Sequence, residues 1–221
     1  MAKIFPAFVL LCASWLIGCS QHTGDAYLDS VTVALLGMPD VELSAEQIAN
    51  VPYPNAYLTV GKLPRAFVVL NYAEHGQLKW ISADHNLFVM QQGRWVKTIG
   101  LEVNLSHIES SHLDPLADGL HLDGATWHWH ADWDQDYTSG RDLISRFKVL
   151  GMESVAVGPD KRQLLAVEEQ VSEVQGEFSY RNHYWLDPNS GAVIKSRQRM
   201  GPKLPELEFV LLKPFSPKES L

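Results

Sequence analysis

The chain has 221 residues, of which 46% are hydrophobic, and a formal net charge of −8 at pH 7. That length and apolar content are enough for one well-cored globular domain, and they exclude a disordered chain. Its basic residues are dispersed, so the chain is a poor candidate for binding nucleic acid, because phosphate recognition needs clustered lysine and arginine side chains.

The N-terminal segment has the pattern of a lipoprotein signal peptide. Lys3 precedes an apolar run over 4–17, which is shorter than the roughly 20 residues that span a bilayer but typical of a signal-peptide core. The run ends in LIGC, which resembles the bacterial lipobox, whose cysteine becomes the acylated first residue after cleavage. We therefore expect a signal peptide over 1–18, acyl chains such as palmitate on Cys19, and a polar tether over 19–24.

Two alternatives to the lipobox are an ordinary secretory signal and an N-terminal anchor helix. Several acyl chains would hold the protein firmly on a membrane. Ser20 stands where an aspartate would favour retention in the inner membrane, so sorting rules predict the periplasmic face of the outer membrane. Because Cys12 belongs to the predicted signal peptide, no disulfide is expected within the mature chain.

The remaining residues, 25–221, are predicted to form a single domain that begins with short helices. Apolar residues repeat every four positions over 25–36, which predicts an amphipathic helix. Ser44 and Gln47 have the spacing of a capping box, which predicts a second helix of about two turns.

From residue 56 onward the pattern is that of β-strands. Short runs rich in β-branched and aromatic residues alternate with turn compositions such as EHG and DPNSG. Residues 105–124 give a weaker signal and are predicted to be a long connection with some local structure. Strands are predicted within 56–60, 65–74, 77–84, 86–92, 94–102, 142–151, 153–158, 162–174, 177–187, 192–200 and 206–215, with another beginning at Ala125.

No helical pattern separates these strands, so consecutive strands should pair antiparallel. Roughly ten strands cannot form one flat sheet and must curl or fold over. The sequence therefore predicts a mainly β fold: one domain of antiparallel strands that form a strongly curved sheet, half-barrel or sandwich, with short N-terminal helices. A closed barrel is an alternative.

The stretch TWHWHADWD, at 126–134, predicts a strand with one buried face and one solvent-exposed face. Side chains alternate across a strand, so the three tryptophans share one face and the histidines share the other with the aspartates. Burying an indole contributes on the order of 2–3 kcal/mol, so the tryptophan face should point inward. His128 and His130 are weak candidates for a metal site, because a third ligand would have to come from elsewhere.

No residue pattern indicates an enzyme or a cofactor site. The chain lacks a Gly-x-Ser-x-Gly elbow, a His-Glu-x-x-His pair and a phosphate-binding glycine loop. A glycosidase pair would need two carboxyl groups facing each other across a cleft, whereas the adjacent Glu168 and Glu169 point oppositely on a strand. We interpret these carboxylates as surface charge and predict a non-enzymatic protein without a cofactor or metal.

Several collinear segments resemble the YjbF/GfcB family of bacterial lipoproteins. They are the run from QIANVPYPN to VKTIGL at 47–101, LDPL at 113–116, YWLDPNSGAVIKSRQRMGP at 184–202 and FVLLKPF at 209–215. The resemblance implies an antiparallel β fold and an outer-membrane lipoprotein of exopolysaccharide and group-four capsule production. It also implies partners from the same operon, a soluble periplasmic protein and an outer-membrane β-barrel.

Two functional hypotheses follow from the resemblance and the curved sheet. The first is a non-enzymatic accessory factor that binds partner proteins or polysaccharide through exposed aromatic side chains. Its candidate residues, for each of which core packing is the alternative, are Trp80, Trp95, Tyr180 and Tyr184. The second is a lipid-handling half-barrel. A deep aliphatic pocket would favour lipid, whereas a shallow groove rimmed by polar and aromatic groups would favour sugar or protein.

Overall fold

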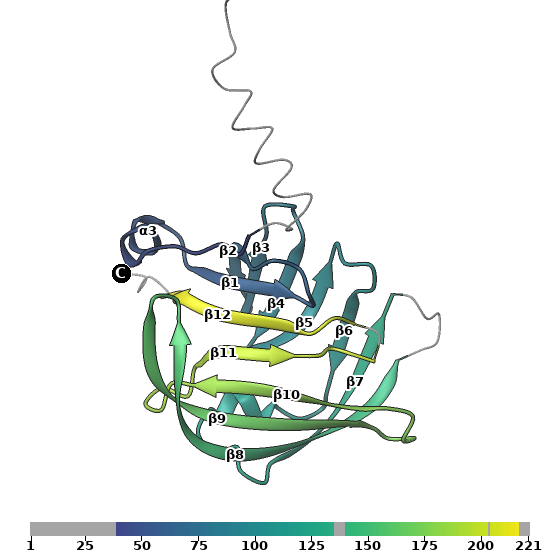
Figure 1. Ribbon diagram of the computed structural model, residues 1–221. Helices are drawn as coiled ribbons and strands as arrows, with labels where there is room; N and C mark the ends of the chain where they lie inside the picture. The colour runs from purple at the N-terminus through teal and green to yellow at the C-terminus, as the bar shows by residue number, and fades with distance from the viewer. Residues whose placement is uncertain (1–38, 135–139, 203, 217–221) are drawn as a thin grey trace, which may run out of the picture. The chain divides into compact units, whose positions relative to one another are not determined.

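The computed structural model describes residues 39–134, 140–202 and 204–216 (Figure 1). The predicted signal peptide, Cys19, the tether and the helix over 25–36 lie outside the described residues. The described residues from Asp40 onward belong to one compact unit, to which the following description applies.

Twelve strands form one antiparallel sheet in the order β5-β4-β3-β2-β1-β12-β11-β10-β9-β8-β7-β6. Neighbours in the sheet are mostly neighbours in sequence, as expected for strands joined by hairpins. The elements are α3 (Ala45–Asn50), β1 (Asn55–Val60), β2 (Ala66–Glu74), β3 (Gln77–Ile81), β4 (Leu87–Gln91), β5 (Arg94–Ile99), β6 (Leu105–Glu109), the 3₁₀ helix η2 (Pro115–Asp118), β7 (Thr126–Trp133), β8 (Arg141–Val157), β9 (Asp160–Glu173), β10 (Ser179–Leu186), β11 (Val193–Gln198) and β12 (Leu207–Lys213).

The sheet curls until its two edge strands, β5 and β6, approach each other, so the unit is a nearly closed, barrel-like sheet (Figure 1). At the approach, the Leu105 amide of β6 donates to Thr98 Oγ1 of β5 at 3.0 Å. The predicted antiparallel, strongly curved β fold is therefore confirmed. Because curling brings the two edge strands together, less unpaired strand edge is left that could form hydrogen bonds with strands of other chains.

Apolar side chains pack on both faces of this sheet. The interior holds the larger cluster, which includes Trp80, Phe88, Trp95 and Phe209. A second, smaller cluster lies on the opposite face, because Tyr57 belongs to it whereas its β1 neighbours Ala56 and Leu58 belong to the interior. The segment before α3 covers this second cluster, and the Leu43 amide donates to the Tyr57 hydroxyl at 2.7 Å.

The capping box predicted before α3 is confirmed. The Gln47 amide donates to Ser44 Oγ at 3.2 Å, and the Ser44 amide donates to Gln47 Oε1 at 2.8 Å. These bonds satisfy two amides that have no partner within the helix.

The structure differs from the sequence prediction in two segments: the local structure expected within 105–124 includes a paired strand, and two runs predicted as separate strands are one. Residues 105–124 include β6 and η2, because Leu105 is buried and β6 pairs with β7. Its signal in the sequence was weak since a register shift between Leu105 and His107 breaks the alternation of apolar residues. The runs predicted as separate strands over 142–151 and 153–158 are one strand, β8, which continues through a register shift at Gly151 with φ of 111°.

Candidate functional site

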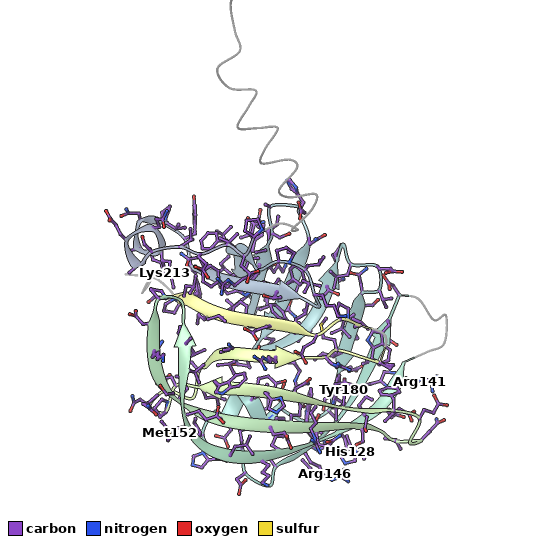
Figure 2. All side chains as sticks on the ribbon, in the orientation of Figure 1. His128, Arg141, Arg146, Met152, Tyr180 and Lys213 are labelled. Atoms are coloured by element: carbon purple, nitrogen blue, oxygen red, sulfur yellow. The ribbon has the colours of Figure 1, made fainter. Side chains whose placement is uncertain are left out.

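Strand β7 has the two faces predicted for TWHWHADWD. Trp127 and Trp129 are 5% and 6% exposed, and their rings stack inside the sheet with centroids 5.2 Å apart. His128 is exposed and lies on the outer surface with Arg146 (Figure 2). His130, on the same outer face, places Nδ1 3.0 Å from Asp142 Oδ1. The outer face of β7 therefore carries solvent-exposed side chains and an exposed histidine–carboxylate pair.

No described group of three or more histidine, cysteine, aspartate or glutamate side chains is placed to hold a metal ion. Within the described residues there is also no helix that is both apolar enough and long enough to cross a membrane.

An ion cluster lies inside the barrel. Arg94, at the start of edge strand β5, is 3% exposed and donates to Glu169 of β9, with Nη2 2.9 Å from Oε1 and Nη1 3.1 Å from Oε2. The same guanidinium binds Asp114, in the loop after β6. Because Asp114 follows the other edge strand, this cluster ties together the two edges of the sheet.

Further buried groups complete the cluster. Glu169 Oε2 accepts hydrogen bonds from Asn182 Nδ2 and from the Tyr184 hydroxyl, each at 2.9 Å. The Arg94 guanidinium carbon lies 4.7 Å from the centroid of the Trp127 ring, within range of a cation–π contact. A fully paired buried network fixes the side chains that belong to it.

The network also sets the protonation states of its members. Burial alone would raise the pKa of Glu169, but the charge and hydrogen bonds of Arg94 lower the pKa below its ordinary value of 4.5, so the carboxylate stays ionised. Burial raises the pKa of Tyr184 well above its ordinary range, so its hydroxyl remains a neutral donor to Glu169. The interpretation of Glu169 as surface charge was wrong, since this residue is 0% exposed.

A cleft of about 680 Å³ opens where the β2–β3 hairpin, η2 and the β10–β11 turn meet, and we treat it as the candidate site. Apolar side chains of the barrel interior lie on its inner side, among them Leu78, Trp80, Met90 and Phe209. Its outer part is lined by polar side chains, which are Glu74, His75, Gln77, Gln92, Asp118 and Ser190. This volume falls within the usual range for small-molecule sites.

Two glycines fix one wall of the cleft. Gly119, at the end of η2, and Gly191, in the β10–β11 turn, have φ of +64° and +72°, which other residues rarely adopt. A Cβ on Gly119 would lie 2.9 Å from the Gly191 Cα, so the two backbones touch directly. Any side chain at either position would push the wall apart.

The aromatic residues predicted as an exposed binding surface are buried. Trp80 and Tyr184 are 0% exposed, Trp95 is 1% exposed and Tyr180 is 8% exposed. Alternation along β3, β5 and β10 places them on the inner face, so core packing holds for all four and they form no exposed aromatic platform. Of the four, Trp80 alone lines the cleft.

Sequence reasoning missed Arg94, Asp114 and the cleft itself. Glu169 had a signal, because it alternates with Val167 and Val171, both of which are fully buried. The cleft had no such signal, since its walls come from segments far apart in the chain.

Comparisons with known proteins agree with this architecture. The chain matches, over residues 28–212, the family model described as "Group 4 capsule polysaccharide lipoprotein gfcB, YjbF". It is 31% identical over 211 residues to the lipoprotein GfcB of Escherichia coli K12, covering 95% of this chain and 98% of GfcB. It is 35% identical over 214 residues to the lipoprotein YjbF of the same organism, covering 94% of this chain and 97% of YjbF.

Among solved structures, the chain is similar to the crystal structure of the hypothetical lipoprotein YmcC from Escherichia coli K12. The TM-score is 0.72 at 30% sequence identity, with 90% of this chain and 100% of that chain covered. Fold and site thus define this chain as a curled antiparallel β domain with a buried ion cluster and a cleft at one end. The chain belongs to the YjbF family of lipoproteins, as the sequence resemblance predicted.

Proposed function

We propose that this chain is a lipoprotein of the outer membrane, anchored through Cys19 and facing the periplasm. In this proposal it acts as a non-enzymatic accessory factor in the secretion or assembly of an exopolysaccharide or capsule. The observation that carries the proposal is the family match over 28–212, because that family is described by its link to group 4 capsule polysaccharide. Two relatives named as lipoproteins, each aligned over more than nine tenths of the chain, support the anchor.

The proposed partners are proteins of exopolysaccharide secretion, namely a soluble periplasmic protein and an outer-membrane β-barrel of the same operon, together with the polysaccharide. The solvent-open cleft supports a binding role, because polar groups surround its apolar floor. The alternative function, handling of lipid by a half-barrel, would be favoured by a deep aliphatic pocket. The carboxylate, imidazole and amide groups around the cleft disfavour an acyl chain, because contact with the chain would remove these polar groups from water without giving them hydrogen bonds.

Replacing the predicted anchor gives the direct test. Cys19→Ala should leave the domain folded, release it from the membrane fraction and reduce the amount of exported polymer several-fold, because each acyl CH₂ contributes about 0.8 kcal/mol to membrane binding. The measurements are immunoblots of soluble and membrane fractions and an assay of surface polysaccharide. Cys12→Ala, in the predicted signal peptide, is the matched control and should change neither. Unchanged membrane association of the Cys19→Ala protein would refute the anchor.

A further inference from the structure

Two tryptophans in the barrel interior have buried donors without a partner. Trp80 Nε1 and Trp95 Nε1 have no hydrogen-bond acceptor among the described residues, and both side chains are at most 1% exposed. An unpaired buried N–H group costs folding free energy, so such groups in native structures call for an explanation. The two indoles differ in one respect, which is that Trp80 lines the end cleft and Trp95 does not.

The cleft has the charge pattern of a site for a neutral ligand. Neither lysine nor arginine occurs among the described residues that line it, whereas Glu74 and Asp118 do. Lys79, which is not among the lining residues, already pairs with Glu74. An acidic sugar or a phosphate group would therefore meet the Asp118 carboxylate and find no lysine or arginine on the cleft wall to bind it. The net charge of −8 for the whole chain adds to that repulsion.

The polar groups of the cleft suit hydroxyl groups. A ligand rich in hydroxyl groups can donate hydrogen bonds to side-chain oxygens of the cleft, such as those of Glu74, Gln92 and Ser190. Indole N–H is a donor only, so Trp80 needs an oxygen acceptor. A neutral saccharide supplies both kinds of group.

We propose that the end cleft binds a short neutral saccharide segment of the exported polymer, and that Trp80 Nε1 donates a hydrogen bond to a sugar oxygen. This inference rests on the proposed function and names the ligand of its site. Trp80 lines the inner side of the cleft but is 0% exposed, so binding as proposed requires the floor of the cleft to rearrange before a sugar oxygen can reach Nε1. Met90 shares that floor, and methionine side chains change rotamer readily.

The test measures saccharide binding to the full-length lipoprotein. The protein is purified in a detergent without a sugar head group, and the probe is a set of oligosaccharides released by mild acid from the polymer that the producing organism exports. Equilibrium dialysis and saturation-transfer NMR then report the dissociation constant. The wild-type protein should bind, and Trp80→Phe, which keeps an aromatic ring but removes the donor, should bind about three- to tenfold more weakly.

Trp95→Phe is the matched control, because it removes an equally buried and unpaired indole donor that does not line the cleft. It should bind like the wild type. Ala192→Trp places a bulky side chain at an exposed position that lines the cleft, and it should abolish binding. Equal affinity of Trp80→Phe and Trp95→Phe would overturn the role of the Trp80 donor, and undiminished binding by Ala192→Trp would overturn the location.

Failure of this inference differs from failure of the proposed function. If the wild-type protein binds none of the oligosaccharides while Cys19→Ala still reduces export, the saccharide site is refuted and the accessory role stands. If the wild-type protein binds palmitate instead of the oligosaccharides, and Ala192→Trp abolishes that binding, the saccharide site is refuted in favour of a lipid site.

Discussion

Replacing Arg94 with methionine is expected to lower the free energy of unfolding by about 3–5 kcal/mol, the usual cost of removing one partner from a buried ion pair. The variant leaves the ionised Glu169 inside the barrel, 0% exposed, without its cation. It also releases Asp114 from the β5 edge. Urea unfolding of the purified domain, followed by tryptophan fluorescence, measures the change.

Arg181→Met is the control for this prediction. Arg181 pairs with Glu168 on the outer face at 3.8 Å, and its side chain is 64% exposed. Exposed pairs contribute about 0–1 kcal/mol, so its replacement should have a small effect. The double variant Arg94→Met/Glu169→Leu should recover part of the loss, since no charge at position 169 is then left unpaired. Equal effects of the two single arginine variants would show that the buried cluster does not hold the barrel together.

Replacing Trp129 with alanine is expected to cost about 3–5 kcal/mol of unfolding free energy, as large-to-small changes in a core do. Trp129 stacks on Trp127, and its Nε1 donates to Ser145 Oγ at 2.9 Å in the barrel interior. The Ser145 hydroxyl would lose the indole donor as well. The measurement is again equilibrium unfolding in urea.

His128→Ala is the matched control, because His128 precedes Trp129 on the same strand and lies on the outer face. Its replacement should change the unfolding free energy by no more than about 0.5 kcal/mol. A larger loss for the histidine than for the tryptophan would reverse the faces of β7 and contradict the inward orientation of the indoles.

The strands could be predicted from the sequence because their signals are local. Alternation in β7 and the turn residues between neighbouring hairpins determine faces and pairing within short stretches of chain. The same local signal failed at β6 and at Gly151, where register shifts interrupt the alternation. Curvature was predicted from strand number alone, whereas closure of the sheet was left as one of several alternatives.

Closure and the site depend on contacts that no local pattern encodes. Arg94 and Glu169 are 75 residues apart, and nothing in either neighbourhood indicates that they pair. The burial of Glu169 could have been inferred, because a strand that buries Val167 and Val171 places residue 169 on the same face. For the aromatic residues, sequence alone could not decide between core and surface, and packing inside the barrel decided for the core.

Polymer export by cells that carry either of two variants tests most directly whether this domain works through its cleft. The comparison sets Ala192→Trp, which blocks the cleft, against His128→Ala/His130→Ala, which strips the imidazoles from the outer face of β7. With both proteins present in the membrane at wild-type levels, we expect Ala192→Trp to reduce surface polysaccharide several-fold and the histidine variant to match the wild type. Normal export with the cleft blocked, together with loss of export in the histidine variant, would contradict the account.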